Sequence, residues 1–297
     1  MQHKIIENNE ITVLIVLYKE SYELISKTLN TLKSYQKIII DNGNDLELKK
    51  KIESFHKIQS YILNKINCGF SVGYNQAIKI CKTEFCLILG PDCIIKDQSI
   101  LKLQEAYKKY DNCFMVAPTS YNEKNELTYT GGPLPENSAK DKILDISGDT
   151  CVQSVLGACM FVKTIDIKNI KMFDEFFFLY YSDDDLCRRI NKINKSIIQV
   201  YNSKCLHTHG ILKIHNNYLK IFIREYNLTY DALYYYYKVN NNNKHFKEIS
   251  KKVKLYLFKF FLKIFFLKIK DAIKIFSVLL AYYKFIYKFK WRGGRVV

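Results

Sequence analysis

The sequence predicts an α/β fold in which a mostly parallel sheet is flanked by helices. Short apolar runs of strand length alternate with stretches of helical spacing over residues 11–118, and this alternation is typical of successive βαβ units. The first run, ITVLIVLYK at 11–19, is almost wholly apolar, as expected of a parallel strand buried on both faces. Hydrophobic residues form 48% of the 297-residue chain and prolines number only four, so we expect a large globular core rather than long linkers.

The elements of this alternation can be assigned in chain order. The expected strands, each short and apolar, are 11–19, 37–42, 61–63, 84–93 and 114–118. The expected helices, each with apolar residues on one side, are 21–35, 46–57, 71–82 and 97–110. Residues 119–150 are expected to form a long loop, of the kind often used for binding. Further strands are expected at 152–163 and 196–201, and residues 204–210 close the α/β part.

An acidic stretch, FDEFFFLYYSDDDLCRRI at 173–190, lies between these last strands. Residues 176–181 are expected to form a buried strand or tight core segment, and a helix with acids in its first turn is expected to follow. Successive helix positions point about 100° apart, so Asp183, Asp184 and Asp185 cannot share one direction. The stretch fits a well-capped helix and equally fits a helix that aims one carboxylate into a cleft as a general base.

Polar side chains follow several of the expected strands, where ligands bind in open α/β sheets. They form the groups Tyr18-Lys19-Glu20, Asp41-Asn42 and Asp92. Carboxylates and imidazoles there suit Mg²⁺ or Mn²⁺ with a phosphorylated ligand, and His207 and His209 would share one side of a strand. No Walker A loop and no G-x-G-x-x-G follows the first strand, so we expect neither a P-loop protein nor a NAD-binding protein.

The composition changes beyond about residue 211. Residues 216–238 are tyrosine-rich and expected to be helical, and 251–290 consist almost entirely of Lys, Phe, Leu, Ile and Tyr. On a continuous helix, seven lysines would form one narrow face: Lys252, Lys259, Lys263, Lys270, Lys274, Lys284 and Lys288. The longest uncharged stretch, 275–283, is far short of the ~20 residues that cross a bilayer. We favour a basic amphipathic helix in the membrane interface. The alternative is a helix or helical pair packed on the α/β part or in a dimer.

The charge of the chain limits the classes of partner to be expected, and its cysteine content indicates the cellular compartment. The formal charge of +17 comes from 46 basic residues, almost all of them lysine, with no nucleic-acid recognition motif beside them. Nucleic-acid binding is therefore not expected, whereas contact with anionic lipid or a phosphorylated substrate is. Nine cysteines without a C-x-x-C pair fit a reducing compartment. The N-terminus lacks a signal-peptide hydrophobic region, so an intracellular location is expected.

Seven segments resemble, in order, the motifs of the inverting glycosyltransferases of family 2, which have the GT-A fold. Within that family they are most similar to the bacterial rhamnosyltransferase-like members. The segments are LIVLYKE (14–20), IIIDNGND (38–45), NCGFSVGYNQA (67–77), LILGPDC (87–93), LGACMFVK (156–163), FDEFFFLYYSDDDLCRRI (173–190) and HTHG (207–210). The resemblance implies a GT-A catalytic domain at 1–215 and a C-terminal helical, basic amphipathic extension at 216–297 for membrane contact or oligomerisation.

The resemblance assigns the donor side of the site to the ends of the first strands. The residues implied in nucleotide-sugar binding are Tyr18, Asp41, Asn42, Asn67, Asn75 and Asp92. Of these, Asp92 would also hold the Mg²⁺ or Mn²⁺ ion at the donor diphosphate, with His207 and His209 as the other metal-side groups.

The resemblance assigns the acceptor side to the acidic helix. Asp183 would be the base that deprotonates the acceptor hydroxyl, Asp185 would support the site, and Asp184 is expected to face away from it. Transfer would be one direct displacement at the anomeric carbon, without a covalent intermediate, and would therefore invert the configuration there.

Four positions depart from the family pattern. Lys19 and Gly90 each replace an Asn, Ala77 replaces a Gly, and Ser182 replaces a Glu beside the base. These departures keep open a catalytically inactive, membrane-associated interaction protein of the same fold. The other alternative is a sugar nucleotidyltransferase, which would need a Gly-rich basic loop where this chain has LYKESYE.

The implied reaction moves a sugar from a nucleotide-diphosphate donor, dTDP-rhamnose or a UDP-sugar, to a hydroxyl group in surface polysaccharide assembly. The acceptor would be a glycan or a lipid-linked glycan. The expected location is cytoplasmic and peripheral on the inner face of the cytoplasmic membrane, with the C-terminal basic helix at the membrane surface. The oligomeric state stays open, and a dimer is one of the alternatives.

Overall fold

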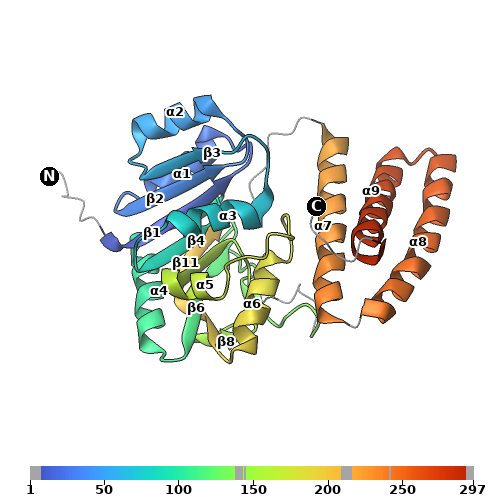
Figure 1. The fold of residues 1–297 in the computed structure, drawn as a ribbon. Helices are drawn as coiled ribbons and strands as arrows, with labels where there is room; N and C mark the ends of the chain where they lie inside the picture. The colour runs from blue at the N-terminus through green and yellow to red at the C-terminus, as the bar shows by residue number, and fades with distance from the viewer. Residues whose placement is uncertain (1–7, 138–142, 144, 209–215, 241, 292–297) are drawn as a thin grey trace. The chain divides into compact units, whose positions relative to one another are not determined.

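The computed structural model describes residues 8–137, 143, 145–208, 216–240 and 242–291 (Figure 1). The chain folds into two compact units. The α/β unit is formed by Met1–Glu175 and Ser182–Lys213, and the helical unit by Phe176–Tyr181 and Ile214–Val297. Each unit has a hydrophobic core of its own, and the segment Phe176–Tyr181 contributes to the core of the helical unit.

The α/β unit is built on a sheet in the strand order β3-β2-β1-β4-β10-β6-β11-β5, with β8 paired to β11. The strands are β1 (Asn8–Leu17), β2 (Tyr35–Asp41), β3 (Ser60–Leu63), β4 (Phe85–Leu89), β5 (Cys93–Ile95), β6 (Cys113–Tyr121), β8 (Thr150–Val152), β10 (Cys159–Lys163) and β11 (Ser196–His207). A separate two-stranded sheet joins β7 (Gly131–Gly132) and β9 (Ser154–Val155).

Most strands of the main sheet point the same way. The pairs β1–β2, β2–β3, β1–β4 and β6–β11 are parallel. Strand β10 is antiparallel to both β4 and β6, so β6 runs in the direction of β4. Residues 11–15 of β1 are all buried, because helices cover both faces of the strand. The mostly parallel α/β fold predicted from the sequence is confirmed.

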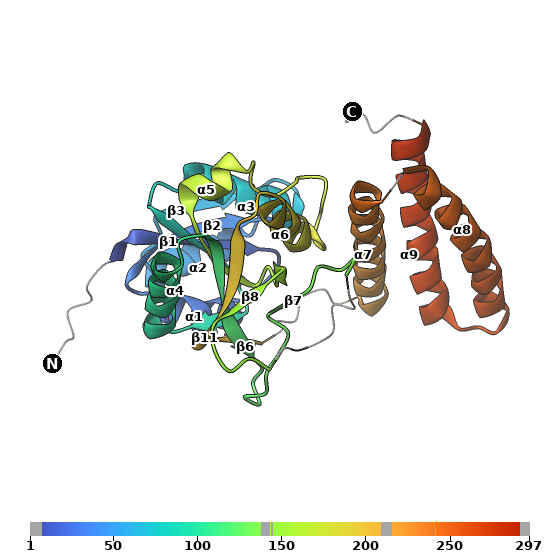
Figure 2. The same ribbon diagram turned by 90° about the horizontal axis from the view of Figure 1, so that it is seen from below.

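Six helices flank this sheet in two layers. The helices are α1 (Tyr22–Asn30), α2 (Leu46–Phe55), α3 (Gly69–Ile80), α4 (Asp97–Lys109), α5 (Thr164–Asn169) and α6 (Ser182–Lys192). Helices α1, α2 and α4 share one core cluster with the sheet, whereas α3, α5 and α6 pack into the cluster on its other face (Figure 2). Side chains cap two of these helices, since Ser21 accepts from the N–H of Leu24 and Asp45 from that of Leu48.

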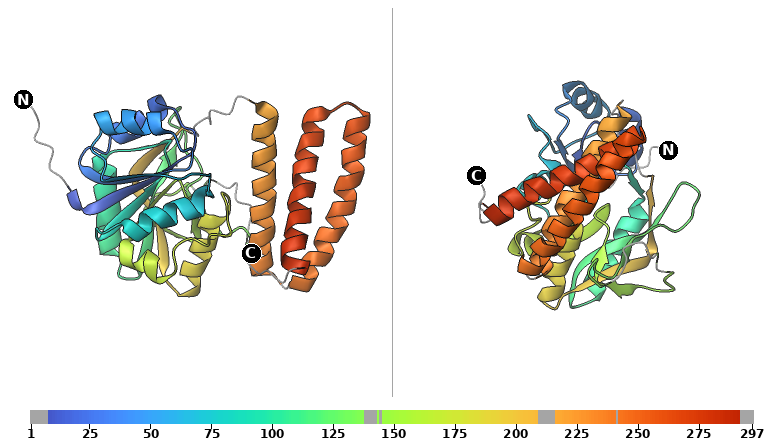
Figure 3. Two further views of the ribbon diagram at one scale, coloured as in Figure 1. Left: turned by 45° about the horizontal axis from the view of Figure 1, so that its top comes forward. Right: turned by 90° about the vertical axis from the view of Figure 1, so that its right-hand side faces the viewer.

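The helical unit consists of α7 (Asn217–Val239), α8 (Asn242–Phe265) and α9 (Ile269–Ile286), followed by a short π-helix (Tyr287–Trp291). Helix α9 packs against both α7 and α8, and these two lie on either side of it (Figure 3). The core is aromatic, and its most buried members include Phe177, Tyr235 and Phe285. Among the residues that the structure describes, no helix is both long and apolar enough to cross a membrane.

Two expectations about local structure can be compared with the structure. Residues 176–181, expected to form a buried strand or a tight core segment, form turns and bends and not a strand. Phe177 is buried in the core of the helical unit, and Phe176 and Tyr181 pack on aromatic side chains of α7. Residues 251–290 do not form one continuous helix, since α8 ends at Phe265 and α9 starts at Ile269. The seven lysines counted on one helical wheel therefore belong to α8, α9 and the π-helix and do not lie on one continuous helix.

Candidate functional site

The predicted donor-side residues gather at one edge of the main sheet. Strands β1, β2 and β4 are parallel, so they end at the same edge. Tyr18 follows β1, Asp41 is the last residue of β2, and Asp92 lies three residues after the end of β4. The antiparallel strand β10 starts at this edge, directly after Gly157 and Ala158.

Asp41 closes β2 with a fully buried carboxylate. The carboxylate accepts hydrogen bonds from the N–H groups of Gly43 (2.7 Å) and Asp45 (3.2 Å) and from the hydroxyl of Tyr61 (3.1 Å). Burial raises the pKa of Asp41, and these three donors oppose that rise. The same carboxylate thus fixes the turn after β2 and lies at the edge of the sheet where the donor-side residues gather.

Asn42 and Asn67 shape the loop that leads into α3. Asn42 donates from Nδ2 to the carbonyl of Gly69 (2.9 Å), and its Oδ1 accepts from Nδ2 of Asn64 (2.8 Å). Asn67 accepts from the N–H of the same Gly69 (2.9 Å). Gly73 lets α3 approach β1 closely, because a Cβ there would lie 2.9 Å from Val16. These contacts bring the NCGFSVG segment next to the end of β2.

Asp92 and His207 form the candidate metal site. Strands β5 and β11 pair with His207 opposite Cys93, which brings Nε2 of His207 to 3.3 Å from Oδ2 of Asp92. The carbonyl of Asp92 also accepts from the N–H (3.0 Å) and the hydroxyl (3.1 Å) of Thr208. Ligand atoms of Asp92, Cys93 and His207 lie within 4.8 Å of one another. His209, the other predicted metal-side residue, lies outside the described residues.

The donor set suits a hard divalent cation that shares its shell with substrate. A hydrogen bond with Cys205, together with burial, holds the pKa of Cys93 well above its usual range, so its thiol stays protonated at neutral pH. The carboxylate of Asp92 and the imidazole of His207 are then the candidate ligand pair. Mg²⁺ and Mn²⁺ take few protein ligands and complete their shells with water and phosphate oxygens, so two protein ligands fit this group.

The three aspartates of α6 have different partners. Asp183 accepts from the N–H of Gly157 (2.8 Å), Asp184 accepts from the hydroxyl of Ser154 (2.6 Å), and Asp185 pairs with Nε of Arg189 (2.9 Å). All three are buried, but Asp183 is 8% exposed whereas Asp184 and Asp185 are 0% and 1% exposed. Asp184 points at β9 and into the protein, and solvent does not reach it.

A short chain of contacts joins the Asp92 loop to Asp183. The N–H of Gly90 donates to the carbonyl of Ala158 (2.7 Å), and the neighbouring Gly157 donates to Asp183. Neither glycine has room for a side chain. A Cβ at Gly90 would lie 2.9 Å from Oδ1 of Asp92, and one at Gly157 would lie 3.3 Å from Cβ of Asp183. The candidate metal carboxylate and the candidate base are therefore connected through two backbone hydrogen bonds, one donated by Gly90 and one by Gly157.

Glu20 belongs to this edge, and the sequence placed it among the polar side chains after the first strand without giving it a role in the site. Its carboxylate is 9% exposed and accepts from the N–H of Tyr18. Burial, opposed by backbone hydrogen bonds and reinforced by the charges of Asp41 and Asp92, raises the pKa of Glu20 to about 7. The turn that folds it back has Lys19 in the left-handed region, at φ 62°. In the sequence, its position directly after an apolar strand was the only indication that Glu20 belongs to the site.

Two predicted site residues have partners away from this edge. Asn75 exchanges hydrogen bonds with the backbone of Phe173, donating at 2.9 Å and accepting at 3.0 Å, and it also donates to Glu175. The partner of Asp185, Arg189, donates in addition to backbone carbonyls of the loop that follows α5. Both side chains hold the chain that precedes α6, so their influence on the site passes through its backbone.

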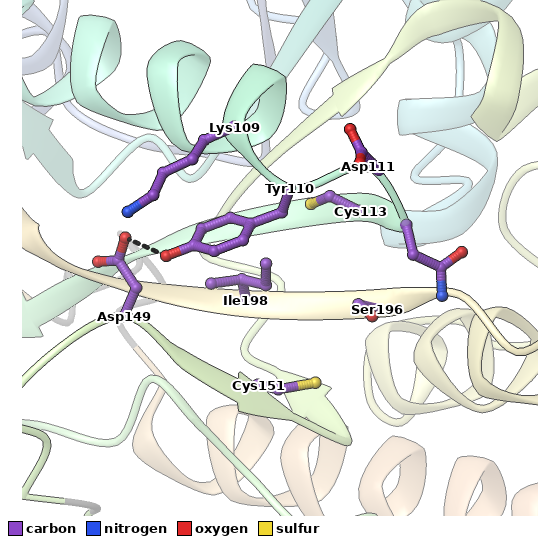
Figure 4. Close-up of a pocket in the computed structure, with 9 residues that line it drawn as sticks. Lys109, Tyr110, Asp111, Cys113, Asp149, Cys151, Ser196 and Ile198 are labelled. Carbon is purple, nitrogen blue, oxygen red and sulfur yellow. Dashed lines mark hydrogen bonds between the residues drawn. The ribbon is translucent and has the colours of Figure 1, made fainter.

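A pocket of about 470 Å³ lies where β6 and β11 begin, at the opposite edge of the sheet. Figure 4 shows Tyr110 reaching across it to Asp149, and their hydrogen bond measures 3.0 Å. Asp149 also accepts from the N–H of Tyr201. A second pocket, of about 730 Å³, lies beside the start of β4. Neither pocket contains a predicted site residue.

Sequence comparisons bear on the part of the chain that forms this edge. A family model for glycosyl transferase family 2 matches residues 12–161. Over 218 residues the chain is 24% identical to the low-salt glycan biosynthesis hexosyltransferase Agl10 of Haloferax volcanii, which covers 68% of each chain. Over 203 residues it is 26% identical to the rhamnosyltransferase WbbL of Escherichia coli, which covers 60% of this chain and 76% of that protein.

Solved structures with the same fold include two transferases. GalNAc-T7 with UDP, GalNAc and Mn²⁺ has a TM-score of 0.56 at 11% identity, covering 71% of this chain and 45% of that chain, so this chain spans less than half of it. The mannosyltransferase PcManGT of Pyrobaculum calidifontis, in complex with GDP-Man and Mn²⁺, has a TM-score of 0.51 at 10% identity, covering 97% of this chain and 76% of that chain. At such identities the likeness concerns the fold alone.

Proposed function

The chain belongs to glycosyl transferase family 2 and has the GT-A fold, and on that premise we propose that it is an inverting, metal-dependent sugar transferase. The donor is a sugar nucleotide, and the acceptor is a hydroxyl of a glycan or a lipid-linked glycan. The observation that carries the proposal is the approach of His207 to Asp92, together with the hydrogen bonds of Gly90 and Gly157 that connect the Asp92 loop to Asp183.

The donor binds along the ends of β1, β2 and β4. Asp41 and Asn42 are already held by their own hydrogen bonds, so little side-chain freedom is lost when a nucleoside contacts them. Tyr18 lies beside them and offers a ring for the base. A divalent cation held by Asp92 and His207 would neutralise charge on the departing diphosphate.

Asp183 is the proposed base. It takes the proton of the acceptor hydroxyl while that oxygen bonds to the anomeric carbon and the bond from that carbon to the donor phosphate breaks. The N–H of Gly157 holds one carboxylate oxygen of Asp183 at 2.8 Å, which orients the group. Asp184 and Asp185 are bound to Ser154 and Arg189 and are less exposed, which favours Asp183 among the three. Asp185, through Arg189, supports the backbone before α6.

The similarity to a rhamnosyltransferase and a hexosyltransferase supports a hexose or deoxyhexose donor. We take dTDP-rhamnose and the UDP-sugars as the first candidates. The lysine-rich helical region supports work on a lipid-linked acceptor at the inner face of the cytoplasmic membrane, within surface polysaccharide assembly.

A donor screen tests the proposal. The full-length protein is incubated with a panel of sugar nucleotides, with Mn²⁺, with Mg²⁺ or with a chelator, and release of the nucleoside diphosphate is measured. We expect one donor to be turned over, and turnover to cease with the chelator. Release of pyrophosphate from a sugar phosphate and a nucleoside triphosphate would instead show a nucleotidyltransferase, and no turnover of any donor would contradict the proposal.

A further inference from the structure

The turn between α8 and α9 carries the most exposed apolar side chains of the helical unit. Phe265 is 78% exposed, Leu267 is 83% exposed and Ile269 is 59% exposed. We call residues 257–269 the hairpin end. Its other strongly exposed apolar side chains are Phe258, Phe261, Ile264 and Phe266. Soluble monomers rarely expose so many neighbouring large apolar side chains without a partner for them.

The backbone of this turn gives a second, independent observation. Leu267 donates to the carbonyl of Ile264 (2.9 Å) and Lys268 to that of Lys263 (2.8 Å), which is the hydrogen-bond pattern of a Schellman motif. The residue in the left-handed position of such a motif is usually Gly, because a Cβ is unfavourable there. Here that residue is Leu267, at φ 52°. An unfavourable conformation thus holds Leu267, the most exposed leucine among the described residues, at the tip of the hairpin.

The charges around the hairpin end have one dominant sign. Residues 254–274 contain six lysines and one acid, Asp271. Asp271 pairs with Lys263 across the two helices at 3.2 Å. Lys259, Lys268 and Lys270 are exposed beside the apolar side chains. Their aliphatic stems can follow the apolar surface while the ammonium groups stay in water or at phosphates.

We infer that the hairpin end inserts into the surface of an anionic lipid bilayer. The side chains at the turn enter the boundary between headgroups and acyl chains, and the surrounding lysines bind lipid phosphates. Two copies joined at this end would bring twelve lysines together, which like-charge repulsion disfavours. This mode differs from a helix lying flat on a lysine face. It deepens the proposed function, on which it rests for the lipid-linked acceptor.

Leu267→Asn is the decisive variant, because it should weaken binding to vesicles without lowering the stability of the fold. Asn adopts the left-handed conformation more readily than Leu, so we expect the variant to melt at the same temperature as the parent or higher. Loss of one inserted leucine should weaken binding to vesicles about tenfold. Ile66→Asn is the matched control, since Ile66 is 76% exposed on the α/β unit and should not affect binding.

Binding is measured with the full-length chain by co-sedimentation with vesicles of phosphatidylglycerol and phosphatidylcholine, and with vesicles of phosphatidylcholine alone. We expect binding only to the anionic vesicles, weakened by salt. Equal binding of the parent and Leu267→Asn, or equal binding to both kinds of vesicle, would overturn the inference. So would a dimer that dissociates in Leu267→Asn while vesicle binding stays unchanged.

Donor turnover without vesicles keeps the two proposals apart. Leu267→Asn should release nucleoside diphosphate at the parental rate, because Leu267 is not part of the transfer site. A parent that binds anionic vesicles but turns over no donor would refute sugar transfer and leave the hairpin inference standing. A parent that turns over donor but does not bind anionic vesicles would refute the hairpin inference and leave sugar transfer standing.

Discussion

The carboxylate of Asp231 on α7 accepts a hydrogen bond from the backbone N–H of Tyr180 at 2.9 Å. The N–H groups of Phe178 (3.1 Å) and Leu179 (2.9 Å) donate to the same carboxylate, and Asp231 is fully buried. One side chain thus satisfies three consecutive N–H groups of the segment Phe176–Tyr181. The bends of that segment are stable away from any sheet because Asp231 takes the place of a neighbouring strand.

Asp231→Ala should destabilise the helical unit by about 3 kcal/mol or more, because three N–H donors lose a charged acceptor. Chemical denaturation followed by circular dichroism would measure the loss. Glu225→Ala is the control on the same helix, since its ion-pair partner Arg224 is 59% exposed and the pair should contribute at most about 1 kcal/mol. Equal stability of the two variants would contradict this account of Asp231.

Lys19→Asn should stabilise the protein by about 1 kcal/mol. Lys19 has φ 62°, where a lysine is strained and an Asn is better tolerated. Thermal and urea denaturation would show the gain. Lys65→Asn, at an exposed loop position without a positive φ, should change stability by no more than about 0.5 kcal/mol. A loss of stability in Lys19→Asn would show that Lys19 has a compensating contact.

Glu20 should make stability depend on pH in a definite direction. Its pKa is raised from 4.5 to about 7 in the folded protein, so between these values the folded state keeps a proton that the unfolded chain has lost. Its contribution to stability is therefore complete below about pH 4.5 and is lost as the pH rises through about 7. Glu20→Gln should flatten this fall, measured by urea denaturation in the presence of a chelator. An unchanged pH profile in the variant would contradict the assignment.

Asp183→Asn should lower the rate of sugar transfer by about 10²- to 10⁴-fold, the usual contribution of a general base. Donor affinity should stay close to that of the parent, since Asp183 acts on the acceptor. The donor found by the screen serves both measurements, by transfer rate and by equilibrium binding. Asp184→Asn is the neighbouring control and should retain much more activity, because Asn can still accept from Ser154. Near-parental transfer by Asp183→Asn would move the base to Asp184 or Asp185.

Gly90→Ala should raise the Mn²⁺ concentration needed for half-maximal turnover. The added Cβ would lie 2.9 Å from Oδ1 of Asp92, so the carboxylate must shift from the position in which it lies 3.3 Å from His207. Gly148→Ala is a matched control, because a Cβ there meets nothing within 4 Å. The same metal dependence in both variants would argue against Asp92 as a metal ligand.

Local patterns were enough to predict the α/β core but not the surroundings of the acidic helix. Apolar runs such as the one in β1 show strands directly, because a strand buried on both faces has no polar alternation. The aromatic residues of Phe176–Tyr181 predicted a core segment, and Phe177 is buried, yet its partners on α7 lie more than fifty positions later in the chain. Nothing local distinguishes burial in a sheet from burial against Tyr234 and Tyr235.

The same limit applies to Glu20 and to the hairpin. The carboxylate of Glu20 reaches this edge because Lys19 has a left-handed backbone conformation. A lysine in the sequence does not indicate that conformation. The turn at residues 266–268 contains neither Gly nor Pro, the usual markers of a helix end. A helical wheel drawn through it therefore assigned lysines of two helices to one face. That Asp92 and His207 lie close together was easier to predict, since each follows an expected strand and ligands bind at such strand ends.

The grouping of Phe176–Tyr181 with the C-terminal helices has a consequence for synthesis of the chain. On the ribosome this segment emerges well before α7, which supplies the hydrogen-bond acceptor Asp231 and the ring of Tyr234 that packs on Phe177. Domains generally fold in the order in which they are made. The nascent α/β unit must therefore wait with an aromatic loop uncovered just ahead of its acidic helix. We expect this interval to be the stage at which the growing chain most needs a chaperone.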